Sequence, residues 1–159
     1  MQERLNYPAI APDGYRAFGK VHQYVANCGL DSMLIHLVYL RVSQINGCAY
    51  CVDLHYRDAL AEGGDPRKLN SVVVWDESPF FSPRERAAFA WAESLTNVAT
   101  THAADEHYNA ARTQFSDKEL VDLSYAVSLM NAFNRLGVGF RKQPAVTQSA
   151  HSAKRHAAE

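Results

Sequence analysis

The chain has 159 residues, which is long enough to bury one hydrophobic core without disulfide or metal staples. Apolar residues make up 47% and charged residues 21%, the balance of a globular protein rather than a disordered one. The formal net charge of −1 gives no general attraction to a nucleic-acid backbone, so we expect no nucleic-acid partner. No apolar run is long enough to span a bilayer, so we expect no membrane partner either.

Apolar residues recur at helical spacing along most of the chain, without convincing strand pairs or an internal repeat. The pattern predicts an all-α fold in a single domain over 1–142. The remaining residues, 143–159, have no apolar period, and we expect a mobile tail there. Helices are expected over 13–27, 31–46, 48–62, 82–99, 105–115 and 116–137, with a short helix or turn-rich segment over 65–75.

Specific residues mark four of the expected helix boundaries. Asn46 and Gly47 form a turn signal that separates two expected helices. Ser82 and Ser116 each have a glutamate three residues later, the pattern of a capping box at a helix start. Gly137 is expected to end the last helix. The turn at Gly47 thus places two helices side by side in a helix-turn-helix.

The segment 43–55 reads SQINGCAYCVDLH and holds most of the functional information. Residues three and four apart share one face of a helix, so Cys48, Cys51 and His55 are predicted to form one stripe. This pattern suits a redox centre, in which one thiolate attacks, the second resolves, and the imidazole moves protons. Either cysteine fits the attacking role: Cys48 would lie at the helix N-terminus, and Cys51 lies one turn before His55.

A second histidine is expected near this stripe. If the turn at Gly47 makes the two helices antiparallel, His36 lies about level with His55 and can face it. Two cysteines and two histidines in one neighbourhood are also a zinc ligand set, so a metal-binding module is the alternative to a redox enzyme. His36 also fits a structural histidine packed between Met33 and Leu40.

The motif resembles that of the alkylhydroperoxidase AhpD-like family, within the carboxymuconolactone decarboxylase superfamily. The likeness continues through 85–93 (ERAAFAWAE) and 131–135 (NAFNR) and covers about residues 7–139. It implies an AhpD-like helical bundle that forms homo-oligomers, often trimers or hexamers. It also implies a thiol peroxidase or disulfide reductase that needs no metal or cofactor.

The resemblance assigns roles that the residues alone leave open. By analogy, Cys51 becomes the sulfenic acid, Cys48 is the resolving thiol that meets the redox partner, and His55 relays protons. The expected substrate is an organic hydroperoxide or hydrogen peroxide, and the expected reductant is an external dithiol or thiol protein. A third reading is a redox-sensing module whose dithiol switches without sustained turnover.

One position departs from the family pattern. The family usually places a glutamate twelve residues before the first motif cysteine as the base of the proton relay, and His36 stands there in this chain. A histidine accepts a proton near neutral pH, so we include His36 among the expected catalytic residues. Decarboxylation of a muconolactone is disfavoured because members with that activity generally lack the dithiol.

The expected location is the cytoplasm. The stretch 1–15 has no positively charged start followed by an apolar core, so we expect no secretory signal. The cysteine count is three, and two of these cysteines lie too close together to staple a fold. In a reducing compartment, a C-x-x-C is more often catalytic or metal-binding than structural.

Overall fold

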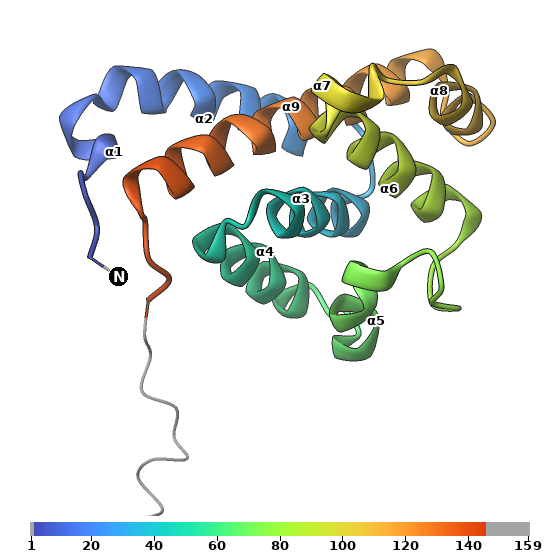
Figure 1. Ribbon diagram of the computed structural model, residues 1–159, viewed down its shortest axis with the longest axis horizontal. Coiled ribbons are helices and arrows are strands. Elements are labelled where there is room, and N and C mark those ends of the chain that lie inside the picture. Colours follow the sequence, from blue (N-terminus) through green and yellow to red (C-terminus); the bar gives the residue numbers. More distant parts are fainter. Residues whose placement is uncertain (1, 146–159) are drawn as a thin grey trace, which may run out of the picture.

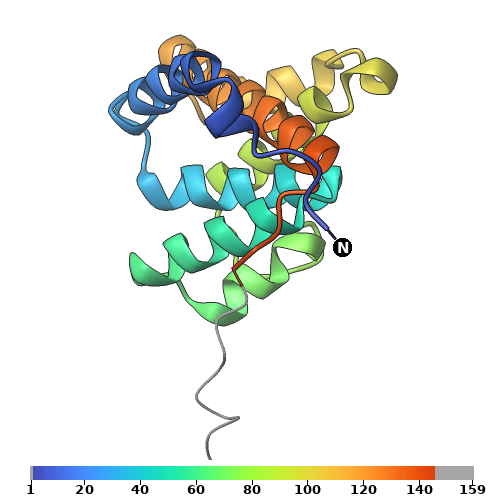
Figure 2. The same cartoon turned by 90° about the vertical axis from the view of Figure 1, so that its left-hand side faces the viewer.

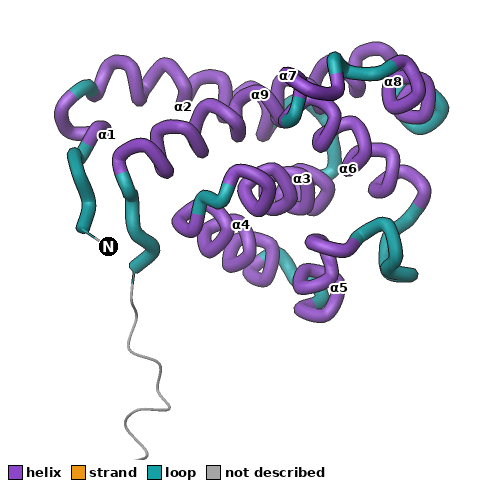
Figure 3. Tube along the Cα trace, viewed as in Figure 1, coloured by secondary structure: helices purple, strands orange, loops and turns teal. Residues whose placement is uncertain are grey.

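The computed structural model describes residues 2–145, so most of the predicted tail, 146–159, lies outside the described residues. Within 2–145 the chain is helical, without strands, which confirms the all-α prediction (Figures 1 and 3). The helices are α1 (Tyr7–Ile10), α2 (Pro12–Ala26), α3 (Ser32–Asn46), α4 (Ala49–Ala61), α5 (Pro66–Asn70), the 3-10 helix η1 (Ser71–Val74), α6 (Pro83–Thr96), α7 (Val98–Thr101), α8 (Asp105–Arg112) and α9 (Asp117–Phe140).

Helix α3 is the centre of the bundle and packs against α4, α9 and α6. Its sequence is apolar nearly all round, and such a helix is stable only when neighbours cover most of its surface. Leu37 and Leu40 belong to a core cluster with α5, η1 and α6, whereas Val38 and Val42 belong to a second cluster with α2, α6 and α9. Asp31 caps the helix by accepting a hydrogen bond from the Leu34 amide at 2.9 Å.

The connection between α3 and α4 has the predicted turn. Gly47 adopts a φ of 67°, a left-handed conformation that glycine enters without the steric cost of a Cβ. Cys48 follows as the N-cap of α4, which then runs beside α3 (Figure 2). The helix-turn-helix that carries the motif is therefore formed as predicted.

Helix α9 crosses the bundle next to α2, with which it packs. Ser116 accepts from the Glu119 amide, and the Glu119 carboxylate accepts from the Ser116 amide, so the predicted capping box is present. The prediction that Gly137 ends this helix is wrong: α9 continues to Phe140, and Arg141 takes the left-handed C-cap position. Gly137 instead faces the motif cysteines, where a side chain would not fit.

None of the described helices is both long enough and apolar enough to cross a membrane.

Candidate active site

The two motif cysteines lie at the start of α4 and are joined by a disulfide bond. Their Cα atoms are 5.4 Å apart, and both residues are buried, with 2% of Cys48 and 5% of Cys51 exposed. Cys48 is the N-cap of the helix and Cys51 lies in its first turn. Free backbone N–H groups at a helix N-terminus stabilise a thiolate, so reduction of this disulfide would release two thiols at a favourable position.

Helix α9 closes over the disulfide at Gly137. A Cβ at this position would lie 2.9 Å from the sulfur of Cys48 and 3.7 Å from the sulfur of Cys51. The first distance is shorter than ordinary van der Waals contact, so only glycine permits this approach without a shift of the helix or the sulfur. The backbone of α9 therefore covers the sulfurs at this position.

His55 lies one helical turn after Cys51, as predicted, and is buried. Its ring packs on Tyr39, with ring centroids 4.8 Å apart. Burial lowers the pKa of His55 to about 3, and the neighbouring His36 and His22 act in the same direction. The imidazole is therefore uncharged near neutral pH.

His36 faces His55 from α3, which confirms the predicted juxtaposition; the ring centroids are 6.0 Å apart. The Nε2 atom of His36 lies 3.1 Å from a carboxylate oxygen of Glu62, and the hydroxyl of Ser32 donates to the other oxygen at 2.8 Å. Both hydrogen bonds lower the pKa of Glu62, and the one from Ser32 has the larger effect. A carboxylate therefore stands behind His36, although position 36 itself is not acidic.

Sequence reasoning missed Glu62. This residue follows the last turn of α4 as its C-cap, seven residues after His55. A spacing of seven returns to the same helical face after two turns, so the spacing itself could have indicated it. Its partners on α3, however, are set by how the two helices align.

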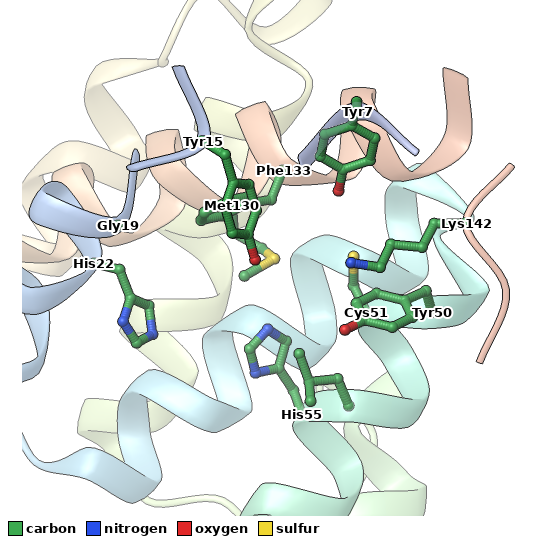
Figure 4. Close-up of a pocket in the computed structure, with 11 residues that line it drawn as sticks. Tyr7, Tyr15, Gly19, His22, Tyr50, Cys51, His55, Met130, Phe133 and Lys142 are labelled. Carbon is green, nitrogen blue, oxygen red and sulfur yellow. The ribbon is translucent and has the colours of Figure 1, made fainter. Parts of the chain in front are cut away.

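A cavity of about 220 Å³ opens beside Cys51 and His55 (Figure 4). Most of its lining is apolar or aromatic, with His22, His55 and Lys142 as the ionisable side chains and tyrosine hydroxyls as further polar groups. The lining residues are Tyr7, Tyr15, Gly19, His22, Tyr50, Cys51, Leu54, His55, Met130, Phe133 and Lys142.

The cavity joins segments that are distant in sequence. Tyr7 and Tyr15 come from α1 and α2, and Lys142 follows α9. The ammonium of Lys142 lies 4.3 Å from the centroid of the Tyr50 ring, a cation–π contact. Tyr50, which stands between the two motif cysteines in the sequence, is a wall residue of this cavity. No local motif marks Tyr7 or Lys142, because only the packing of α1 and α9 brings them to the cysteines.

A network of amide hydrogen bonds joins the end of α3 to α9. Asn46 donates to the side-chain oxygens of Asn131 and Asn134, both at 3.0 Å, and Asn134 donates to the Ser43 hydroxyl at 3.0 Å. Asn134 is fully buried. The network ties the end of α3 to α9 and so holds the two walls of the disulfide site together.

The described residues bring one set of metal-capable side chains together, formed by His36, His55 and Asp58, with one ligand atom from each lying within 4.8 Å of the others. Neither motif cysteine belongs to this set.

Comparisons with known proteins support the fold and show the family. Residues 12–94 match the model of the carboxymuconolactone decarboxylase family. The uncharacterized protein YdfG of Bacillus subtilis (strain 168) is 30% identical over 145 residues, covering 91% of this chain and 99% of YdfG. The chain therefore belongs to the carboxymuconolactone decarboxylase family, in its AhpD-like branch.

Solved structures extend this comparison. A protein of unknown function from Agrobacterium tumefaciens, described as a candidate antioxidant defence protein AhpD, is 38% identical with a TM-score of 0.90; the match covers 92% of this chain and all of that one. The debrominase Bmp8 has the same fold, with 21% identity, a TM-score of 0.78, and coverage of 87% of this chain and 74% of its own. At that identity the likeness concerns the fold alone.

Proposed function

We propose that this protein is a thiol-dependent peroxidase, a disulfide oxidoreductase that reduces hydroperoxides through Cys48 and Cys51. The observation that carries the proposal is the placement of the Cys48–Cys51 disulfide at the wall of an apolar cavity, beside a buried, uncharged histidine. The family relationship supports the same chemistry.

The proposed cycle starts from the dithiol. The Cys51 thiolate attacks the terminal oxygen of the hydroperoxide, the O–O bond breaks, and the alkoxide leaves as an alcohol after it gains a proton. This step leaves Cys51 as a sulfenic acid. The thiolate of Cys48 then attacks the sulfur of that sulfenic acid, and the hydroxide that leaves is protonated to water. An external dithiol returns two electrons and restores both thiols. Cys51 takes the attacking role because it lines the cavity, whereas Cys48 does not.

His55 is the proton carrier in this cycle. It accepts the proton of a motif thiol and returns one to the leaving oxygen, which requires an imidazole that is neutral at rest. His36 and Glu62 form the second part of the relay, since a hydrogen bond of 3.1 Å joins Nε2 of His36 to the Glu62 carboxylate. This chain thus keeps a carboxylate in the relay by a different route from the family pattern.

The cavity favours a compact organic hydroperoxide. Its volume of about 220 Å³ is below the usual range of pockets for drug-sized ligands, and Tyr7, Tyr15 and Phe133 present apolar ring surface. An alkyl or aryl group gains free energy on entering such a site, whereas hydrogen peroxide gains little.

Replacement of single cysteines tests the proposal. Cys51→Ser is expected to abolish steady-state consumption of cumene hydroperoxide by the reduced protein with excess dithiol. Cys28→Ser is the matched control, because Cys28 is free and outside the cavity lining, and this variant should keep the wild-type rate. Retained turnover in Cys51→Ser would overturn the proposal. One disulfide formed per chain without repeated turnover would instead identify a redox sensor.

We also propose that the protein forms a homo-oligomer through α2 and α9. Six large apolar side chains on these helices are 38–52% exposed, which is costly for an isolated chain. They are Tyr15, Val21, Tyr24, Val121, Tyr125 and Val138. Light scattering after size exclusion should give a trimer or a hexamer, and Val121→Asp should lower the assembly state; a monomeric wild type would contradict this.

A further inference from the structure

A second group of chemically active side chains lies at the far end of the same helix pair. His55 and Asp58 are three residues apart on α4 and therefore share a face, and His36 approaches them from α3. One ligand atom from each lies within 4.8 Å of the other two. These residues line a second cavity of about 310 Å³, which shares His22 and His55 with the first and also includes Glu62.

Two ring nitrogens in this group are buried without a partner. The Nδ1 atoms of His36 and His55 have no hydrogen bond among the described residues. Such atoms cost free energy when nothing binds them, and so they point to a ligand. The third member of the group, Asp58, is half-buried.

Glu62 prepares His36 for a ligand role. Its carboxylate lies 3.1 Å from Nε2 of His36, which places the ring proton on Nε2 and leaves the lone pair of Nδ1 free. A carboxylate behind a histidine, with the opposite ring nitrogen free, is the usual outer-shell arrangement of histidines that bind metal. Ser32 holds Glu62 in place with a hydrogen bond of 2.8 Å.

We propose that His36, His55 and Asp58 form a binding site for a divalent first-row transition ion such as Zn²⁺. Two imidazoles and one carboxylate suit zinc and its neighbours, whereas Ca²⁺ and Mg²⁺ prefer oxygen ligands throughout. Three protein ligands leave at least one coordination position open toward the cavity. The motif cysteines take no part in this ligand set.

The ligand atoms need only a small adjustment. Zn–N and Zn–O bonds of about 2.0–2.2 Å place tetrahedral ligands roughly 3.3 Å apart. The largest separation within the group is 4.8 Å, so a bound ion would draw its ligands together by up to about 1.5 Å. Asp58 on α4 is half-buried, so its carboxylate can move toward the ion by a change of rotamer.

Binding here has a consequence for the thiols. An ion held by His55 occupies the imidazole that serves Cys51, and an ion on His36 interrupts the relay to Glu62. The site would therefore suppress thiol chemistry when the ion is bound. The binding claim itself rests on the ligand group and not on the proposed peroxidase function.

The test uses the full chain with the Cys48–Cys51 disulfide intact, so that the sulfurs are unavailable. Titration calorimetry with Zn²⁺ should give one ion per chain, and Co²⁺ should give visible d–d absorption without a thiolate-to-cobalt band. Asp58→Asn should weaken binding at least ~10-fold. Asp53→Asn is the matched control: Asp53 lies on α4 but pairs with Arg57, and this variant should bind as the wild type.

Three results would overturn the proposal: no binding by the oxidised chain, binding unchanged in Asp58→Asn, or binding only after reduction with a thiolate band. The last would assign the ion to the cysteines. Peroxidase assays on metal-free protein remain an independent measurement, so failure of either proposal is seen separately.

Discussion

Two polar groups near the motif differ in whether their hydrogen bonds are made. In the first group, Asn46 donates to the side-chain oxygen of Asn134, and Asn134 donates to the Ser43 hydroxyl, both at 3.0 Å. In the second group, His36 and His55 keep Nδ1 atoms without partners among the described residues. Both groups connect α3 with a neighbouring helix.

The difference indicates what each group does. A satisfied buried network stabilises one arrangement of helices, and its loss leaves donors and acceptors without partners. An unsatisfied buried group lowers stability, and it is retained where a proton, substrate or ion is handled. We therefore expect changes in the asparagines to reduce stability and changes in the histidines to reduce activity.

The largest separation of these effects is expected for His55→Phe. Loss of the proton carrier should lower peroxide turnover by at least ~100-fold, the usual lower range for a general acid–base group. Because the buried Nδ1 atom disappears, the free energy of unfolding should stay within about 1 kcal/mol of wild type. Turnover assays and urea denaturation on one preparation measure both. A folded variant with normal turnover would remove His55 from the mechanism.

Asn134→Ala should show the opposite behaviour. It removes hydrogen bonds with the half-buried Asn46 and the buried Ser43, for an expected loss of about 3 kcal/mol in the free energy of unfolding. The rate per folded chain at low temperature should change less than that of His55→Phe. The surface variant Asn27→Ala should cost within about 0.5 kcal/mol. Equal losses in the two asparagine variants would contradict a structural role for the network.

A smaller effect is expected where α9 meets the sulfurs. Gly137→Ala places a Cβ 2.9 Å from the Cys48 sulfur and should destabilise the oxidised protein by about 1–3 kcal/mol. Gly139→Ala meets no atom within 4 Å and should instead stabilise the helix by about 0.5–1 kcal/mol. Thermal denaturation of the pair compares them directly, and an equal gain in both would show that α9 does not contact the disulfide closely.

The smallest effect is expected at the outer end of the relay. Glu62→Gln keeps the shape of the side chain but removes the charge of the group that His36 is hydrogen-bonded to, so turnover should fall roughly fivefold. Ser32→Ala should act in the same direction and more weakly, because Ser32 only positions Glu62. Full turnover in Glu62→Gln would show that Glu62 takes no part in the relay and that the relay extends no further than His36.

The sequence predicts what depends on spacing along one helix or across one turn. The stripe of Cys48, Cys51 and His55 follows from helical periodicity, and the turn at Gly47 is enough to place His36 opposite His55. Gly137 shows the limit of this reasoning. Glycine both ends helices and permits close approach, and only the position of the sulfurs shows that the second role applies here.

The remaining parts of the site depend on tertiary packing. Lys142 and Tyr7 reach the cavity because the segments after α9 and before α2 converge on α4, which no local pattern encodes. Asp58 lies on the same helix as the motif, but the sequence did not indicate it as a ligand, because only the packing of α3 brings His36 next to it. The chemistry of the motif can thus be inferred from the sequence. The cavity and the proposed ion site depend on how the helices pack together.

The most direct test of the central claim is mass spectrometry of the reduced protein after one equivalent of cumene hydroperoxide. The account predicts a loss of two hydrogens per chain, a new bond mapped between Cys48 and Cys51, and one equivalent of the corresponding alcohol. Intact thiols at both positions, with the hydroperoxide unconsumed, would contradict it.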